Sequence, residues 1–321
     1  MKLQTNLPLK PNESNQINYD SKLLLLGSCF SENIGDKFSY YKFQSLINPF
    51  GILFHPLAIE KFISSVISQK LFSSNDTFYN NDRYHSFESH SRLSHISQDQ
   101  LVQNLNDKRE QTFQFLNETT HIVITLGTAW AYKHIQSNQY VANCHKVPQN
   151  QFTKHLLSVE EITQSLTVIK NQILEFNPKV KFILTISPVR HLKDGFLEST
   201  RSKAHLIAAV HKVLNLEAFS KTVHADYFPS YEIVMDELRD YRFFKEDMIH
   251  PNQIAVDYIW EQFQKVHISK EVDQVMIQVA DIQNGLNHRP LNPNSKAHQS
   301  FLQKLNEKQL QLTSKYPHIQ F

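Results

Sequence analysis

Residues 22–30 of the 321-residue chain have the sequence KLLLLGSCF. A run of leucines that stops at a glycine is typical of a strand buried on both faces of a parallel sheet. Gly27 then permits a tight turn, and Ser31 can cap a following helix that carries Glu32 in its first turn. This stretch therefore predicts a strand, a turn and a helix, the repeating unit of an α/β fold.

The same unit recurs along the chain. Further strands are expected at residues 44–47, 121–126, 182–186 and 222–226. Helices are expected at residues 56–71, 97–118, 159–176, 199–216 and 251–266. This alternation of strands and helices, repeated about five times, predicts a doubly wound parallel sheet.

The chain is expected to fold as one main domain, residues 21–266, with an extended arm before it at residues 1–20. Residues 267–321 are more polar and predict a C-terminal helical extension. Inside the main domain, residues 72–96 are polar and contain the turn signal NND at residues 80–82. This pattern predicts an inserted hairpin.

The composition excludes several classes of protein. The formal net charge of +2 gives no electrostatic basis for binding nucleic acid. Two cysteines, Cys29 and Cys144, make no disulfide framework in so long a chain, so a reducing compartment is expected. No apolar run approaches the roughly 18 residues of a membrane span, and the N-terminus lacks a signal peptide. We therefore expect a cytoplasmic protein without membrane, metal or cofactor; the sequence predicts no oligomeric state.

Two short motifs carry the candidate chemistry. Cys29 lies where the first expected helix begins, and a helix N-terminus favours thiolate, a strong nucleophile; the alternative is a buried structural cysteine. Asp247 lies three residues before His250, so its carboxylate can hold one tautomer of the imidazole; the alternative is a solvated surface loop. Ligands bind at the carboxyl ends of parallel strands, and glycines there indicate tight turns or close backbone approach. These glycines are Gly27, Gly51 and Gly127.

Several stretches of sequence together resemble one family. They are GSCFS at residues 27–31, NPFG at 48–51, LGTAW at 126–130, NCHKVP at 143–148 and SPVRH at 187–191. In this order, between about Leu23 and Trp260, they resemble the GSCFA family within the SGNH (GDSL-like) hydrolase superfamily. The resemblance implies a flavodoxin-like, three-layer α/β/α fold and a hydrolase that acts on ester bonds.

The resemblance also implies roles for individual residues. On the superfamily's first block, G-D-S, Gly27 matches the glycine, Ser28 the aspartate and Cys29 the nucleophile. Ser28 is the rival nucleophile. Asp247 and His250 match both residues of the last block, D-x-x-H.

The third block of the superfamily, G-x-N-D, is matched only in part. Gly127 matches its glycine and is followed by Thr128, but Ala129 stands where the oxyanion-hole asparagine is expected. Losing one such donor typically costs about 10²–10³ in rate. Thr128, Asn143 or a backbone N–H are the candidate replacements.

Further residues are expected around the pocket. Gly51, with Asn48 beside it, best matches the glycine of the second block, and its N–H is expected to bind the oxyanion. Arg190, just past an expected strand, can clamp a carboxylate or phosphate of the substrate; the alternative is a surface salt bridge. His145 and Cys144 are expected to line the pocket.

The resulting hypothesis is hydrolysis of an acyl ester of a small molecule or glycan. Cys29, or Ser28, attacks the acyl carbonyl, His250 acts as general base, and Asp247 orients His250. An O-acyltransferase shares the first half-reaction. A non-catalytic ligand-binding protein of the same fold is the alternative from another class. A third alternative is a redox protein with a couple between Cys29 and Cys144.

Overall fold

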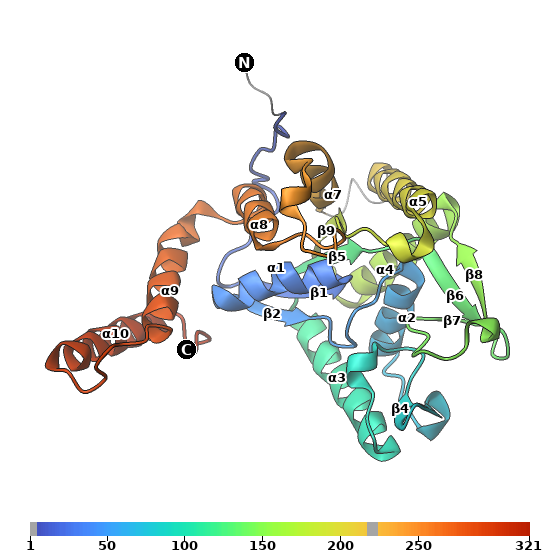
Figure 1. The fold of residues 1–321 in the computed structure, drawn as a ribbon, viewed down its shortest axis with the longest axis horizontal. Coiled ribbons are helices and arrows are strands. Elements are labelled where there is room, and N and C mark those ends of the chain that lie inside the picture. Colours follow the sequence, from blue (N-terminus) through green and yellow to red (C-terminus); the bar gives the residue numbers. More distant parts are fainter. Residues whose placement is uncertain (1–4, 217–223) are drawn as a thin grey trace.

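In the computed structural model, which describes residues 5–216 and 224–321, a parallel sheet lies at the centre (Figure 1). Its strands are β1 (Lys22–Gly27), β2 (Gln44–Ile47), β5 (His121–Leu126), β9 (Lys181–Ile186) and β10 (Ala225–Phe228). Their spatial order is β10-β9-β5-β1-β2, so the chain proceeds outward in both directions from the gap between β1 and β5. This is the doubly wound order of flavodoxin-like folds, and the predicted fold class is confirmed. Residues 222–223 of the last predicted strand lie outside the described residues.

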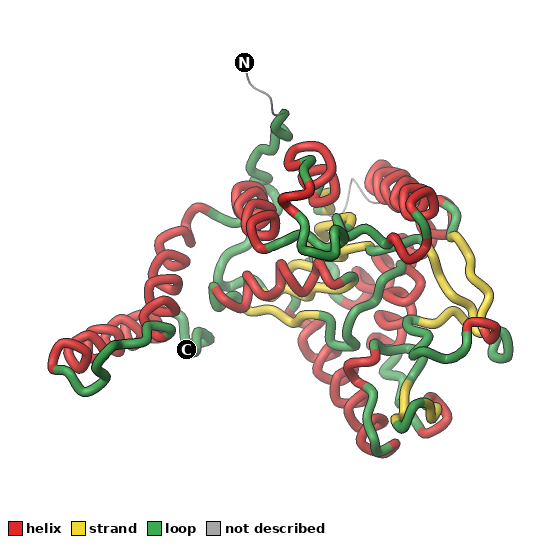
Figure 2. Tube along the Cα trace, viewed as in Figure 1, coloured by secondary structure: helices red, strands yellow, loops and turns green. Residues whose placement is uncertain are grey.

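Helices cover both faces of the sheet (Figure 2). The long helices of the described residues are α1 (Cys29–Tyr40), α2 (Pro56–Ile67), α3 (Gln98–Glu118), α4 (Val159–Phe176), α5 (Phe196–Asn215), α8 (Gln253–His267), α9 (Asp273–Leu286) and α10 (Lys296–Lys315). Leu24 and Leu26 of β1 pack in the layer that contains α2, α3, α4 and α5. Leu23 and Leu25 pack in the layer that contains α1 and α8. Both faces of β1 are apolar for this reason, which accounts for the unbroken leucine run.

Helices α1, α5 and α8 begin at residues other than those predicted; α5 begins at Phe196 rather than at residue 199. The N-cap of α1 is Ser28, whose extended backbone (φ −71°, ψ 173°) suits that position, rather than Ser31. Ser31 lies inside the helix, and its hydroxyl donates to the carbonyl of Leu26 at 2.9 Å. α8 begins two residues after Pro251, with Asn252 as its N-cap. Among the described residues, no helix combines the length and apolarity needed to cross a membrane.

Two antiparallel elements accompany the central sheet. β6 (Trp130–His134), β7 (Gln139–Val141) and β8 (Phe152–Leu156) form a small sheet in the order β7-β6-β8, which was not predicted. β3 (Phe78–Asn80) and β4 (Arg83–His85) pair as the predicted hairpin. The hairpin turn places Asn81 and Asp82 at positive φ values of 47° and 58°, as two-residue turns of this kind require. The small sheet follows β5 directly and so extends from the carboxyl edge of the central sheet.

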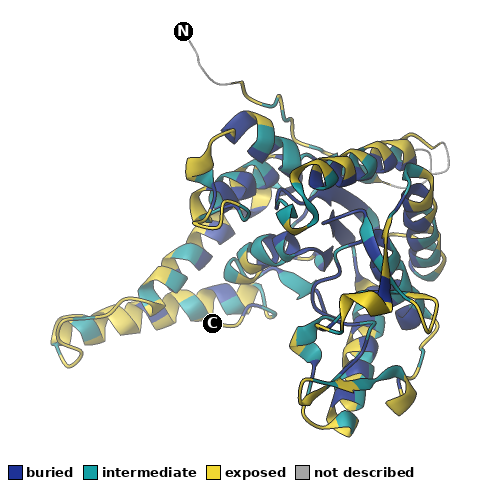
Figure 3. Cartoon of the chain, turned by 45° about the vertical axis from the view of Figure 1, so that its right-hand side comes forward, coloured by how far each residue is buried: buried dark blue, intermediate teal, exposed yellow. Residues whose placement is uncertain are grey.

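The N-terminal arm packs against the end of α8. The N–H of Ile17 donates to the carbonyl of His267 at 2.7 Å, and the N–H of Ser269 donates to the carbonyl of Ile17 at 2.9 Å. The N-terminal arm is therefore fixed against this helix. α9 and α10 form a helical hairpin that projects from the rest of the molecule (Figure 1), and much of its surface is exposed (Figure 3). Leu305 and Leu312 are buried residues of α10.

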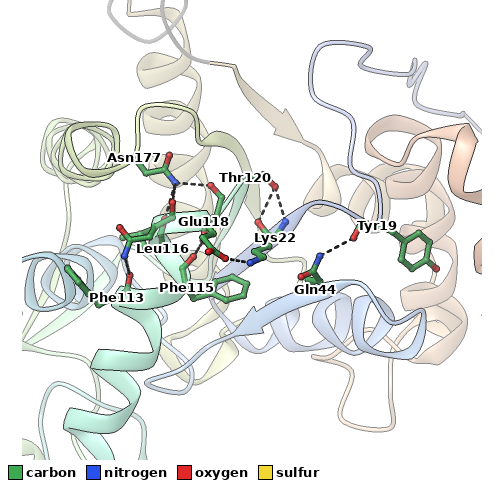
Figure 4. Close-up of polar contacts among 11 residues, drawn as sticks. Tyr19, Lys22, Gln44, Phe113, Phe115, Leu116, Glu118, Thr120 and Asn177 are labelled. Atoms are coloured by element: carbon green, nitrogen blue, oxygen red, sulfur yellow. Dashed lines mark hydrogen bonds and ion pairs between the residues drawn. The ribbon is translucent and has the colours of Figure 1, made fainter. Parts of the chain in front are cut away.

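The amino edge of the sheet is tied together by polar contacts (Figure 4). The side-chain amide of Asn177 donates to the carbonyl of Leu116 at 2.9 Å. The N–H of Lys22 donates to the hydroxyl of Thr120 at 3.0 Å, and the Lys22 ammonium pairs with Glu118. These contacts join segments of the fold to one another. A ligand site is expected at the opposite, carboxyl edge, where parallel sheets bind ligands.

Candidate functional site

The loop after β1 is pressed against β5 at the point where the strand order reverses. Gly27 has φ +127°, and a Cβ at this position would lie 2.0 Å from the carbonyl oxygen of Thr125. The N–H of Ser28 donates to the same oxygen at 3.0 Å. Only glycine fits such an approach. The contact sets the start of α1, and with it Cys29, at the switch point of the sheet.

Ser28 and Cys29, the two predicted nucleophiles, have different surroundings. Ser28 is fully buried, and its hydroxyl accepts the N–H of Phe30 at 3.2 Å as the N-cap of α1. Cys29 is the first residue of the helix and is only partly buried, with a free thiol. The Ser28 hydroxyl is therefore occupied in capping, whereas the Cys29 sulfur is available.

The pKa of the Cys29 thiol lies above its ordinary value. Burial is the main cause, and the nearby carboxylate of Glu32 raises the pKa further. Lys203 and the N–H groups of Cys29 and Phe30 act in the opposite direction. The expected thiolate-favouring effect of the helix N-terminus is present but is outweighed by burial. The resting thiol is protonated near neutral pH, so attack by its sulfur requires a base.

Asp247 and His250 form a pair in the loop before α8. One carboxylate oxygen of Asp247 accepts the N–H groups of Ile249 and His250, each at 2.9 Å. The other oxygen lies 2.7 Å from Nδ1 of the His250 ring. These hydrogen bonds, led by the backbone N–H of His250, lower the pKa of Asp247 to about 2. The carboxylate stays charged and fixes the orientation of the imidazole.

Arg190 holds the loop that carries this pair. The N–H of Arg190, beyond the end of β9, donates to the carbonyl of Ile249 at 3.3 Å. Its guanidinium carbon lies 4.6 Å from the ring centre of Phe244 and 5.4 Å from that of Tyr241. The side chain therefore stacks on aromatic rings of the Asp247–His250 loop, an arrangement that differs from both the substrate clamp and the salt bridge considered from the sequence.

The sulfur of Cys29 and the ring of His250 are not joined by a hydrogen bond in the part of the chain that the structure describes. Two further residues, Lys203 and His191, lie at the same edge: the Lys203 ammonium donates to the carbonyl of Ser187 at 2.6 Å, and Arg190, which precedes His191, donates its N–H to the carbonyl of Ile249 at 3.3 Å. Burial, then Lys203, then His250 lower the pKa of His191 to about 3, and Lys203 also acts on Cys29. The carboxyl edge thus holds the thiol, the ammonium and both imidazoles.

A cleft of about 370 Å³ opens at the same edge. Residues that line it include Phe54, Thr128, Trp130, Asn143, Cys144 and His191. Asn143 accepts the N–H of His145 through its side-chain oxygen at 2.8 Å, and its amide nitrogen makes no hydrogen bond with any described residue. Burial raises the pKa of Cys144 to about 11. The cleft is therefore walled by the small antiparallel sheet and by the loops after β5 and β9.

The backbone N–H groups at the third block, those of Gly127, Thr128 and Ala129, already donate to other groups of the protein. The N–H groups of Gly127 and Thr128 both donate to the carbonyl of Phe54, at 2.9 and 3.0 Å. The N–H of Ala129 donates to the hydroxyl of Ser202 at 2.7 Å. The Thr128 hydroxyl lies 3.0 Å from the same Ser202 oxygen. Of the expected replacement donors, the amide of Asn143 is the group left free.

The second block also differs from the expected arrangement. The N–H of Gly51 donates to the carbonyl of Asn48 at 2.7 Å, so this N–H is used within a turn. The side-chain oxygen of Asn48 accepts the N–H of Gly27 at 2.9 Å. Its amide nitrogen is buried and has no partner among the described residues. Asn48 therefore offers a donor beside the Cys29 loop, and Gly51 does not.

His145 is held within the inserted segment. Its Nδ1 lies 3.0 Å from the hydroxyl of Ser91, and its Nε2 lies 2.7 Å from the carbonyl of Ser86. Burial lowers its pKa to about 4. Both ring nitrogens are engaged, so this residue braces the insertion. Residues 5–216 and 224–321 contain no cluster of three His, Cys, Asp or Glu side chains suited to a metal ion.

Lys203 and His191 were not singled out from the sequence. Lys203 lies on the buried face of α5. The sequence does indicate that Lys203 is buried, because this lysine lies at helical spacing from other residues of the buried face. The members of this face include Ser199, Ser202, Lys203, Leu206 and Val210. His191 ends the SPVRH stretch, and its Nε2 is buried without a partner among the described residues.

The fold and these side chains define a doubly wound α/β protein with a cysteine and an Asp–His pair at the carboxyl edge of its sheet. The chain belongs to the GSCFA family, whose model matches residues 22–263. A second model, described as the GSCFA domain protein, C-terminal domain, matches residues 279–321. No curated protein matches the sequence.

One solved structure that resembles the chain is a carbohydrate esterase family 3 from Talaromyces cellulolyticus. The two sequences are 13% identical, and the TM-score is 0.28. The alignment covers 50% of this chain and 60% of that one, less than two thirds of the esterase chain. A TM-score this low supports no conclusion about activity.

Proposed function

We propose that the protein is an acyl-ester hydrolase with Cys29 as nucleophile, His250 as general base and Asp247 as the residue that orients His250. The observation that carries the proposal is the 2.7 Å contact between Asp247 and Nδ1 of His250 at the sheet edge that also holds the Cys29 thiol. Acyl transfer requires a base that is oriented by a carboxylate and can reach the nucleophile, so His250 must approach the Cys29 sulfur in the substrate complex. The resemblance to the SGNH superfamily supports the same chemistry.

The reaction follows from these roles. The Cys29 sulfur attacks the acyl carbonyl while its proton moves to Nε2 of His250, since burial keeps the resting thiol protonated. The tetrahedral intermediate collapses, the ester C–O bond breaks, and His250 returns the proton to the leaving alcohol. Water, deprotonated by His250, then attacks the thioester carbonyl, the C–S bond breaks to release the carboxylic acid, and His250 returns the proton to the departing Cys29 thiolate. Asp247 stays ionised throughout and stabilises the imidazolium.

The cleft at the same sheet edge supports a small-molecule or glycan ester as the substrate, although its lining in the described part of the chain does not include Cys29 or His250. The amide of Asn48 and the N–H of Cys29 are the proposed oxyanion donors. The cleft presents the rings of Trp130 and Tyr132, and aromatic faces of this kind pack on apolar acyl chains or sugar rings. The free amide of Asn143 adds a donor for the alcohol portion.

The test is hydrolysis of short-chain aryl esters and thioesters by matched variants. Cys29→Ala and His250→Ala are expected to lower kcat/KM by about 10²–10⁴. Ser28→Ala is expected to keep the activity while losing about 1 kcal/mol of stability with the cap. Cys144→Ala is the control for the second thiol; Cys144 lines the cleft, so KM can change, but kcat should stay at the wild-type value. Full activity in either Cys29→Ala or His250→Ala removes the mechanism.

A non-catalytic ligand-binding protein is the second candidate, and one observation favours it. The expected N–H donor of Gly51 and those of the third block are used inside the fold, and the Cys29 thiol is protonated at rest. In that case the cleft binds a ligand without turnover. A wild type that is inert towards every ester but gains thermal stability from added sugars would support it. An acyltransferase would instead transfer the acyl group to an added alcohol, so a new ester would form rather than the free carboxylic acid.

A further inference from the structure

Lys203 is a lysine of α5 buried at the carboxyl edge of the sheet. Its side chain is part of the protein interior, and the residue is 3% exposed. The ammonium donates to the carbonyl of Gly127 at 2.8 Å and to that of Ser187 at 2.6 Å. These carbonyls follow β5 and β9, so one ammonium joins the ends of two adjacent strands.

The charge of this ammonium has no carboxylate partner in the part of the chain that the structure describes. Among the described residues, no carboxylate oxygen lies within 4.0 Å of its nitrogen. Burying a cation without a counter-ion is costly, and burial lowers the pKa of Lys203 to about 7. An ammonium has three N–H donors, and two of them are satisfied by the strand-end carbonyls. The site is therefore short of negative charge.

The groups that face Lys203 come from three other elements. From α1, Cys29 follows Ser28, whose Cβ would lie 3.2 Å from a Cβ built on Gly127, the residue whose carbonyl accepts the Lys203 ammonium at 2.8 Å. Cys29 also raises the pKa of Lys203. From the loop after β9, His191 is kept neutral by burial and by Lys203 itself. From α7 (Ser230–Glu232), the ring of Tyr231 lies with its centre 5.7 Å from the ammonium nitrogen. Of these, Cys29 is the group that can supply an anion during the proposed reaction. Glu32 acts on Cys29 from the same helix and disfavours that anion.

We propose that Lys203 is a positioning residue that ties the ends of β5 and β9 together and stabilises the thiolate of Cys29 when the proton leaves the sulfur. The catalytic importance of the pair formed by Lys203 and Cys29 rests on the proposed function, whereas the stabilisation of the thiolate by Lys203 does not. The sulfur loses its proton to His250 or to water, and the thiolate raises the pKa of Lys203, so the nitrogen keeps its proton while the sulfur is ionised. The thiolate then supplies the negative charge that the buried ammonium lacks, and each charge favours the other.

The test is alkylation of Cys29 by iodoacetamide, which needs no ester. The background is Cys144→Ser, so that one thiol remains, and rates are followed from about pH 6 to about pH 10. Lys203→Met removes the charge at similar volume and is expected to move the midpoint of the rate profile up by about one pH unit. The readout is the midpoint of the pH profile. A thiolate with a higher pKa is less abundant but more nucleophilic, so the rate at any single pH understates the change in the thiol pKa.

Two controls keep the result specific. Lys203→Arg preserves the charge and should restore the midpoint towards that of the wild type. Lys212→Met removes a lysine of the same helix that pairs with Glu160 at the surface, and should leave the midpoint unchanged. An unmoved midpoint in folded Lys203→Met, judged by circular dichroism, overturns the proposal.

A second measurement applies if Lys203→Met does not fold. Carbamylation of Lys203 by cyanate, read by peptide mass, is compared between wild type and Cys29→Ala. Removal of the thiol is expected to make Lys203 reactive at lower pH, and identical profiles overturn the proposal. Ester turnover is scored separately. A shifted alkylation midpoint without ester turnover supports the interaction of Lys203 with Cys29 and contradicts the proposed hydrolase. Ester turnover without a shifted midpoint supports the hydrolase and contradicts the interaction.

Discussion

Gly27→Ala is expected to lower the free energy of unfolding by about 2–4 kcal/mol. A Cβ at this position would lie 2.0 Å from the Thr125 carbonyl oxygen, whereas real Cβ contacts under 3.0 Å are essentially never seen, so β1 and β5 must separate by about 1 Å. The backbone at φ +127° adds about 1–3 kcal/mol of strain for a residue with a Cβ. Separation also weakens the hydrogen bond from Ser28 to Thr125, worth about 1 kcal/mol.

The assay is urea unfolding followed by circular dichroism, with Gly285→Ala as the matched control. Gly285 lies inside α9, where an added Cβ meets the end of the flexible Leu305 side chain at 2.7 Å. Alanine gains about 1 kcal/mol of helix propensity there, so the control should stay within about 1 kcal/mol of the wild type. A Gly27→Ala protein as stable as this control would refute the steric argument for the loop that carries Cys29.

Three further outcomes are expected. Glu32→Gln removes a charge that raises the pKa of Cys29, so alkylation of this thiol should become faster near neutral pH; an unchanged or slower rate contradicts the assignment. Ser202→Ala leaves the buried N–H of Ala129 without its acceptor and should cost about 1–3 kcal/mol in urea unfolding. Burial lowers the pKa of five described histidines to about 3 or about 4, namely His55, His121, His145, His191 and His267. Below about pH 6.5 the unfolded chain binds protons that these folded histidines do not, so stability is complete above that pH and falls as the pH drops towards 4. Equal urea midpoints at about pH 7.5 and about pH 5 would contradict this.

The sheet was predictable because its signal is local and strong. A strand such as β1 that is covered on both faces needs apolar residues at every position, and the leucine run shows this directly. The N-cap of α1 was wrongly placed at Ser31. The close approach of Gly27 to Thr125, a residue far away in the sequence, fixes where the helix begins, and no local pattern records that contact.

The candidate site was predictable to the extent that its parts are short motifs. The three-residue spacing of Asp247 and His250 is sufficient for their hydrogen bond. The surroundings of Lys203 depend instead on α5 packing across the ends of β5 and β9, three separate segments. The N–H of Gly51 donates to the carbonyl of Asn48 within a turn, and a match to a sequence motif does not reveal this hydrogen bond.

The most direct measurement is the site of acylation in a single turnover. A short-chain aryl ester is mixed with excess protein, the reaction is quenched with acid, and the acyl group is located by peptide mass. An acyl thioester on Cys29 that forms in the wild type and forms far more slowly in His250→Ala is the expected result. Acylation that spares Cys29, or that proceeds equally fast without His250, would contradict the account.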